Sequence, residues 1–171
     1  IRSLRNYSRK IECLLDGDSA GQRAALRILP MVLQAGMEMQ ILVLPQGKDP
    51  DCLLQEEGVA AIERLRAQAL SPMAFAVKAH LPQDHLPTPR EKADAFGELA
   101  RLILLCESEI VRQGYLNQTA RLLGIDAATA TRDFELIRRA AKRQSAGAPA
   151  LLSPAESEPA RLTSAEEDLL L

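Results

Sequence analysis

The chain has 171 residues, which is enough for one ordinary domain or two small ones. Only 3% of the residues are aromatic and none is Trp, so a core has to be built from aliphatic side chains, as in packed helices. The net charge of −2 excludes a chain that holds DNA by overall charge alone, and no apolar stretch is long enough to span a bilayer.

The first third of the chain has the order strand, helix, strand. Ile11 to Leu15 is a short apolar run that predicts a buried strand, in which Glu12 is an awkward member. A helix with apolar side chains at helical spacing follows from Ser19, and Met39 to Leu44 is a second strand-like run. This order predicts a parallel pair joined by a crossover. Because two strands do not make a stable sheet, we expect further strands upstream of this sequence.

The rest of the chain predicts helices only. Proline and glycine punctuation, helical spacing and a capping box at Thr88 place these helices at residues 50–57, 59–69, 71–82, 89–106, 109–123 and 126–142. Residues 145–162 are rich in Ala, Pro, Ser and Glu and indicate a linker, after which residues 163–171 begin one more helix. The predicted fold class is therefore α/β followed by all-α, with a small parallel sheet and then a helical bundle.

Two aspartates directly follow the first predicted strand. In an extended chain Asp16 and Asp18 point to the same face and would project from the carboxyl end of the strand, where open α/β sheets bind ligands. Carboxylate oxygens suit Mg²⁺ or Mn²⁺, and two such ions could share a bridging carboxylate. Gly17 and Gly21 would let the backbone and a substrate phosphate come close.

A second acidic pair follows the second predicted strand. Asp49 and Asp51 would lie at the same edge of a parallel sheet as the first pair, and bound cations would relieve the repulsion among four carboxylates. Lys48 could neutralise a carboxylate or contact a phosphate. The structural alternative is that Asp49 only caps a helix that Pro50 begins, while Asp51 favours the helix dipole and Lys48 is solvated.

The first acidic pair and the cysteines also allow other interpretations, some of which the sequence excludes. The first pair could be a solvated turn or a cap, whereas an EF-hand loop fails at Ala20 and Arg27, where oxygen ligands are required. The three cysteines form no Cys-x-x-Cys pair, which excludes a zinc ribbon within this chain. Cys13 and Cys106 lie in apolar runs, and an odd cysteine count fits a reducing, cytoplasmic compartment.

These motifs resemble those of a known family. The run from Leu15 to Gly21 (LDGDSAG) resembles the Asp-x-Asp motif of TOPRIM domains in the form found in bacterial DnaG-type DNA primases, and residues 44–51 (LPQGKDPD) look like the family's second acidic motif. Residues 71–139 resemble the helical subdomain that follows, and residues 161–166 (RLTSAE) resemble the entry to a helicase-binding region. The order and spacing of the two acidic motifs also match the family.

The resemblance implies a division of the chain and a function. It implies the C-terminal part of a TOPRIM catalytic domain at 1–70, a helical subdomain at 71–144, a linker at 145–162 and the start of a truncated helicase-binding region at 163–171. The intact bacterial protein would synthesise RNA primers on single-stranded DNA from ribonucleoside triphosphates. Asp16 and Asp18 match the family's metal-binding, catalytic carboxylates, and Asp49 and Asp51 match its further acidic pair.

The resemblance also implies that much of the protein lies outside this chain. The family's Glu at the end of the first TOPRIM strand, its zinc-binding domain and its basic subdomain are absent, and the sequence has no initiator Met, so we expect an excised piece or an incomplete gene product. The fragment alone would be inactive, with zinc elsewhere and the replicative helicase bound through the missing C-terminal region.

Alternative functions remain open at this point. Another TOPRIM phosphoryl-transfer protein, such as a nuclease or a topoisomerase, shares the first motif, and a non-catalytic helical interaction module would need only capped turns. Residues 117–138 also have the pattern of a helix-turn-helix, in which Gln118, Thr119, Thr129, Thr131 and Arg132 would face DNA. The competing interpretation is an ordinary pair of packed helices, which we favour.

Overall fold

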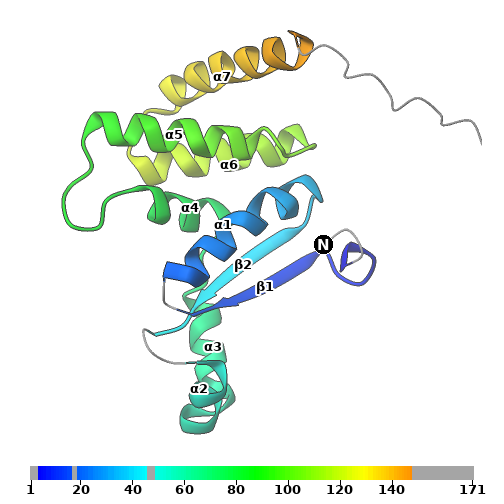
Figure 1. Cartoon of the computed structure of the whole chain (residues 1–171), viewed down its shortest axis with the longest axis vertical. Coiled ribbons are helices and arrows are strands. Elements are labelled where there is room, and N and C mark those ends of the chain that lie inside the picture. Colours follow the sequence, from blue (N-terminus) through cyan, green and yellow to red (C-terminus); the bar gives the residue numbers. More distant parts are fainter. Residues whose placement is uncertain (1–3, 17–18, 46–48, 148–171) are drawn as a thin grey trace, which may run out of the picture.

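The computed structural model describes residues 4–16, 19–45 and 49–147. In chain order the elements are η1 (Leu4–Asn6), β1 (Lys10–Leu15), α1 (Ser19–Gln34), β2 (Glu38–Val43), α2 (Pro50–Glu57), α3 (Val59–Ala67), α4 (Pro72–His80), α5 (Pro89–Ile103), α6 (Glu109–Leu123) and α7 (Ala127–Gly147). Figure 1 shows α4–α7 stacked on one side of the two strands and the α2–α3 hairpin projecting on the other. The predicted order of elements, α/β and then all-α, is confirmed.

The two strands form the expected parallel pair. Their register runs from Lys10 opposite Glu38 to Leu15 opposite Val43. One further backbone bond extends the pairing past the strands, because the amide of Leu44 donates to the carbonyl oxygen of Leu15 at 2.9 Å. The chain segments that follow β1 and β2 therefore leave the sheet side by side.

The prediction that Ile11 to Leu15 is a buried strand is wrong for most of its length. Only Leu15 is buried, while Glu12 and Leu14 are exposed and Ile11 and Cys13 are half-buried. The physical reason is that β1 packs one face on the core, leaves the alternate side chains outward, and pairs with β2 as its single strand partner among the described residues. An exposed position explains why Glu12 is tolerated.

The second strand is more enclosed than the first. Met39, Ile41 and Leu42 are buried in β2, which suits a strand with neighbours on both edges. On the edge away from β1, Leu70 makes an isolated antiparallel bridge to Ile41, with backbone N···O distances of 2.9 and 2.8 Å. This short pairing was not expected from the sequence, which shows no strand after Asp49.

Side-chain caps begin several helices, and the capping box predicted at Thr88 is confirmed, although α5 ends at Ile103 and not at the predicted residue 106. The side chains of Ser71, Thr88 and Ser108 each accept a hydrogen bond from the backbone amide three residues later, and the Thr88 cap forms the complete capping box. Gly124 ends α6 at a φ of 64°, a left-handed conformation that favours glycine. Asp126 accepts from the amide of Thr129 at 3.0 Å at the start of α7.

Helix α7 runs to Gly147, a few residues into the predicted linker. The rest of that linker and the predicted helix start at 163–171 lie outside the described residues. No helix in the described part of the chain has the length and apolar character needed to cross a membrane.

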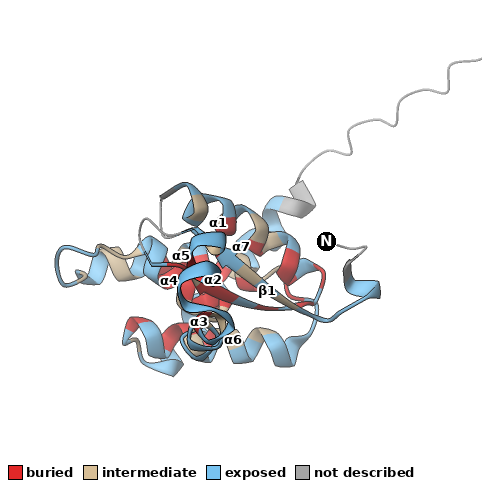
Figure 2. Ribbon diagram, turned by 90° about the horizontal axis from the view of Figure 1, so that it is seen from below, coloured by how far each residue is buried: buried red, intermediate tan, exposed pale blue. Residues whose placement is uncertain are grey.

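The buried side chains form one large core and one small satellite. The large core joins α1 and β2 to α4, α5, α6 and the first half of α7. The satellite consists of Leu44, Leu53 and Ala61, with Ile62 and Leu65 packed on it, and it holds the α2–α3 hairpin. In Figure 2 this hairpin faces the viewer and is coloured mostly as exposed. The buried apolar contact of the hairpin is thus this small satellite, which is separate from the large core.

Candidate metal centre at the carboxyl edge of the sheet

The parallel pairing brings the two acidic segments out at one edge of the sheet. Asp16 directly follows Leu15, whose carbonyl oxygen accepts from the Leu44 amide, so Asp16 and the residues after Leu44 begin next to each other. The Asp16 side chain is exposed. A carboxylate in this place is open to solvent and to a cation.

Asp49 caps a helix, which is the structural alternative to metal binding that its sequence position allows. It is the N-cap of α2: its Oδ1 accepts from the amide of Cys52 at 2.7 Å, and its Oδ2 lies 3.5 Å from the Cys52 Sγ. These hydrogen bonds from the Cys52 backbone and thiol lower the pKa of Asp49, so the carboxylate is ionised. Asp51 is exposed in the first turn of the same helix. The cap is therefore real, but it leaves lone pairs on both Asp49 oxygens.

The remaining predicted residues are less constrained. Gly17, Asp18 and Lys48 lie outside the described residues, and Gly21 is half-buried in the first turn of α1. In the described ranges, no three or more His, Cys, Asp or Glu side chains are arranged to hold a metal ion. The convergence of four carboxylates therefore stays a prediction.

The chemistry of the described donors fits the expected ions. Asp16, Asp49 and Asp51 offer exposed carboxylate oxygens, which are hard ligands suited to Mg²⁺ or Mn²⁺. The low pKa of Asp49 favours the charged form that binds a cation. Sequence reasoning missed Cys52 at this edge; the neighbouring Asp49 raises the pKa of its thiol, chiefly by accepting its hydrogen bond. The signal was available, since Cys52 lies three residues after an N-cap aspartate.

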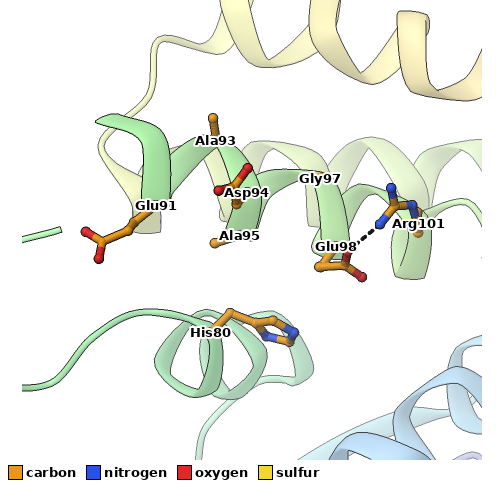
Figure 3. Close-up of a pocket in the computed structure, with 8 residues that line it drawn as sticks. All are labelled: His80, Glu91, Ala93, Asp94, Ala95, Gly97, Glu98 and Arg101. Atoms are coloured by element: carbon orange, nitrogen blue, oxygen red, sulfur yellow. Dashed lines mark hydrogen bonds and ion pairs between the residues drawn. The ribbon is translucent and has the colours of Figure 1, made fainter. Parts of the chain in front are cut away.

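A separate cavity of about 410 Å³ lies between α4 and α5. Figure 3 shows His80 from α4 facing Glu98 and Arg101 of α5, which pair with each other, while Asp94 lies one turn away. The Nδ1 of His80 is 2.8 Å from the carbonyl oxygen of Ala76, so the ring is held by its own helix. Asp16, Asp49 and Asp51, the predicted metal-binding residues that the structure describes, do not line this cavity.

The helix-turn-helix interpretation is wrong for the residues of α6. Thr119 is fully buried, and Gln118 donates from Nε2 to the Ser71 hydroxyl at 2.7 Å, so both side chains face the bundle. Thr129 and Thr131 are exposed but bond to their own helix, through Asp126 and the Ala127 carbonyl. Ordinary packing of α6 against its neighbours is the outcome, because α6 buries Thr119 and turns Gln118 toward Ser71, whereas Thr129, Thr131 and Arg132 on α7 are exposed.

Comparisons with known proteins agree with the fold and the motifs. Residues 1–54 match a family model described as Toprim-like, and residues 73–128 match the DnaB-helicase binding domain of primase. The DNA primase of Escherichia coli (strain K12) is 33% identical over 128 residues, which are 73% of this chain and 22% of the relative.

Two solved structures have the same fold over most of the chain. One, of the DnaG catalytic core, is 32% identical, with a TM-score of 0.63 over 75% of this chain and 43% of that one. The other, a DnaG primase catalytic domain bound to ssDNA, has the same identity and TM-score over 75% of this chain and 42% of that one. The chain spans about a fifth of the length of the curated relatives it matches.

Proposed function

We infer that this chain, which belongs to the DnaG-type DNA primase family, supplies the carboxylates that hold the catalytic metal ions of a primase. The intact protein would synthesise short RNA primers on single-stranded DNA from ribonucleoside triphosphates in the bacterial cytoplasm. The observation that carries the proposal is the parallel β1–β2 pair, whose ends deliver Asp16 and the Asp49 segment to one edge of the sheet.

Each described carboxylate has a role that its position supports. Asp16, with Asp18, would bind Mg²⁺ or Mn²⁺ from the end of β1, and Asp49 and Asp51 would complete the sites from the start of α2. Two or more bound ions would polarise the α-phosphate of the incoming nucleotide and stabilise the charge that develops when the primer 3′-hydroxyl attacks. Lys48, Gly17 and Gly21 would contact the nucleotide phosphates. This part alone would be inactive, because it spans only about a fifth of the length of its primase relatives.

The test is primer synthesis by the full-length protein with single substitutions. Asp16→Asn removes a charge from an exposed carboxylate, and we expect at least a roughly 100-fold loss of synthesis with unchanged thermal stability. Asp49→Asn is the more specific test, since Asn caps a helix as well as Asp does. The substitution therefore keeps the helix cap and removes only the charged metal ligand. Asp94→Asn, at an exposed α5 aspartate paired with Arg90, is the matched control. Full activity of both Asp16→Asn and Asp49→Asn would refute the metal role.

The alternative TOPRIM activities have a distinct outcome in the same assay. Metal-dependent cleavage of DNA without any need for ribonucleotides would indicate a nuclease. A protein that neither synthesises nor cleaves, with or without these carboxylates, would indicate a helical interaction module. The family's primase relatives favour synthesis.

We also propose that the replicative helicase contacts the helical part of this chain. The match to a DnaB-helicase binding domain falls on residues 73–128, inside α4–α7, and not at residues 161–166, whose resemblance led us to expect this contact further along the chain. Ile110 on α6 is an apolar side chain with 86% exposure in that range. Ile110→Ser should weaken helicase binding in a surface plasmon resonance assay. Leu136→Ser, at an exposed leucine of α7 outside the matched range, is the control, and equal effects of the two variants would contradict this surface.

A further inference from the structure

The α2–α3 hairpin carries half of the proposed metal site but is only lightly attached to the sheet. Asp49 and Asp51 lie at its start, and its apolar contact with the rest of the chain is the satellite of Leu44, Leu53 and Ala61. Figure 1 shows the hairpin projecting away from the helical bundle. The orientation of α2 against the sheet therefore decides where the second acidic pair lies relative to Asp16.

A polar link crosses from this hairpin to the first strand. The guanidinium of Arg66, in the last turn of α3, donates to both carboxylate oxygens of Glu12 on β1, from Nε at 3.0 and 3.1 Å and from Nη2 at 2.9 Å. Its Nη1 donates to Glu63 of the same helix at 2.8 Å. This forked contact has the geometry that gives Arg its directional specificity.

The two ends of the link are tied to the two halves of the site. Glu12 lies on β1, four residues before Asp16, which directly follows the last residue of the strand, so the two are held by the same strand. Arg66 lies on the helix that packs on α2, which has Asp49 as its N-cap and Asp51 in its first turn. The pair is about half exposed, with side-chain exposures of 44% for each partner, so it adds little to stability but restricts direction.

We propose that Arg66 is a positioning residue, which through Glu12 sets the placement of the Asp49–Asp51 segment relative to Asp16 and thereby tunes metal affinity. This inference rests on the proposed function, because it requires both acidic segments to bind the same ions. Loss of the link removes none of the metal-binding carboxylates, but it lets the hairpin shift on the small satellite cluster and on the Leu70–Ile41 bridge that follows α3. The affinity for the metal ions then falls, since ligand geometry is less well held.

The experiment measures Mn²⁺ binding to the full-length protein by the electron paramagnetic resonance signal of free Mn²⁺, together with the thermal midpoint. Arg66→Gln should weaken Mn²⁺ binding about 10-fold, as loss of a residue that orients metal ligands commonly does. The control is Arg64→Gln, because Arg64 pairs with Glu57 inside the hairpin and does not reach β1. It should leave Mn²⁺ binding within about 2-fold, and both variants should keep similar thermal midpoints.

A double-mutant cycle identifies the link itself. Glu12→Gln should reproduce the effect of Arg66→Gln, and the double variant should be no weaker than either single one. Equal Mn²⁺ binding by Arg66→Gln and Arg64→Gln, or additive effects in the cycle, would overturn the inference. Asp16→Asn separates the two proposals. If Asp16→Asn leaves Mn²⁺ binding intact, the proposed metal site is wrong. If Asp16→Asn abolishes Mn²⁺ binding while Arg66→Gln binds Mn²⁺ normally, only the positioning role is refuted.

Discussion

Replacing Leu53 by Ala should loosen the α2–α3 hairpin without unfolding the helical bundle. Leu53 is 3% exposed in the satellite cluster, while its neighbour Leu54 on the same helix is 42% exposed. Leu→Ala removes the equivalent of about three methylenes, and at ~0.8 kcal/mol each, with partial collapse of the small cluster, the cost is about 2 to 3 kcal/mol. Leu54→Ala removes the same atoms from a half-exposed place and should cost under about 1 kcal/mol.

The assay is hydrogen exchange of the full-length protein, followed by mass spectrometry. Because each 1.4 kcal/mol is a factor of ten, peptides from residues 50–67 should exchange roughly 30- to 150-fold faster in Leu53→Ala. Peptides from α5 and α6 should be unchanged, since their side chains belong to the large core. Equal exchange in the Leu53 and Leu54 variants, or faster exchange throughout the bundle, would refute a separately anchored hairpin.

Three further results are expected. Thr119 is fully buried and its hydroxyl has no hydrogen-bond partner among the described residues, so Thr119→Val should raise the free energy of unfolding by about 1 kcal/mol in urea titration, and a loss of stability would contradict this. Asp49→Asn should lower the pKa of Cys52, since Asp49 raises it, and speed alkylation by iodoacetamide near neutral pH; an unchanged rate would show that Asp49 does not control the thiol. Hydrogen bonding to Glu91 is the main cause that raises the pKa of His85, so the protonated ring stabilises the fold below its unfolded pKa and this contribution disappears as pH rises through the folded pKa. Glu91→Gln should lower the pKa of His85 in an NMR titration, and no change would exclude the contact in solution.

Local signals were sufficient for the elements and for much of the site. Caps at Ser71, Thr88 and Ser108 and the break at Gly124 mark helix ends through interactions within a few residues, so they can be read along the chain. The parallel pairing also follows from the order of elements, because a strand, a helix and a strand rarely connect otherwise. The cap at Asp49 was foreseen as one of two roles.

The sequence did not predict which faces of β1 and α6 are exposed. Ile11 to Leu15 is apolar enough for a buried strand, yet Glu12 and Leu14 are exposed on the face of β1 that points away from the core. Gln118 is polar enough to face DNA, yet it turns inward to reach Ser71 on another helix. The residue type limits the contacts that a side chain can make, whereas the neighbouring elements decide whether it is buried and which contact it makes.

The sequence by itself determined the elements, their order and the two acidic segments, since each depends on residues close together in the chain. Only the tertiary structure decided how those segments are held: Glu12 looked misplaced until Arg66, 54 residues later, came to lie beside it. Contacts between distant residues depend on how helices pack against the sheet, and that packing is set by the sum of many apolar contacts, which no local pattern records.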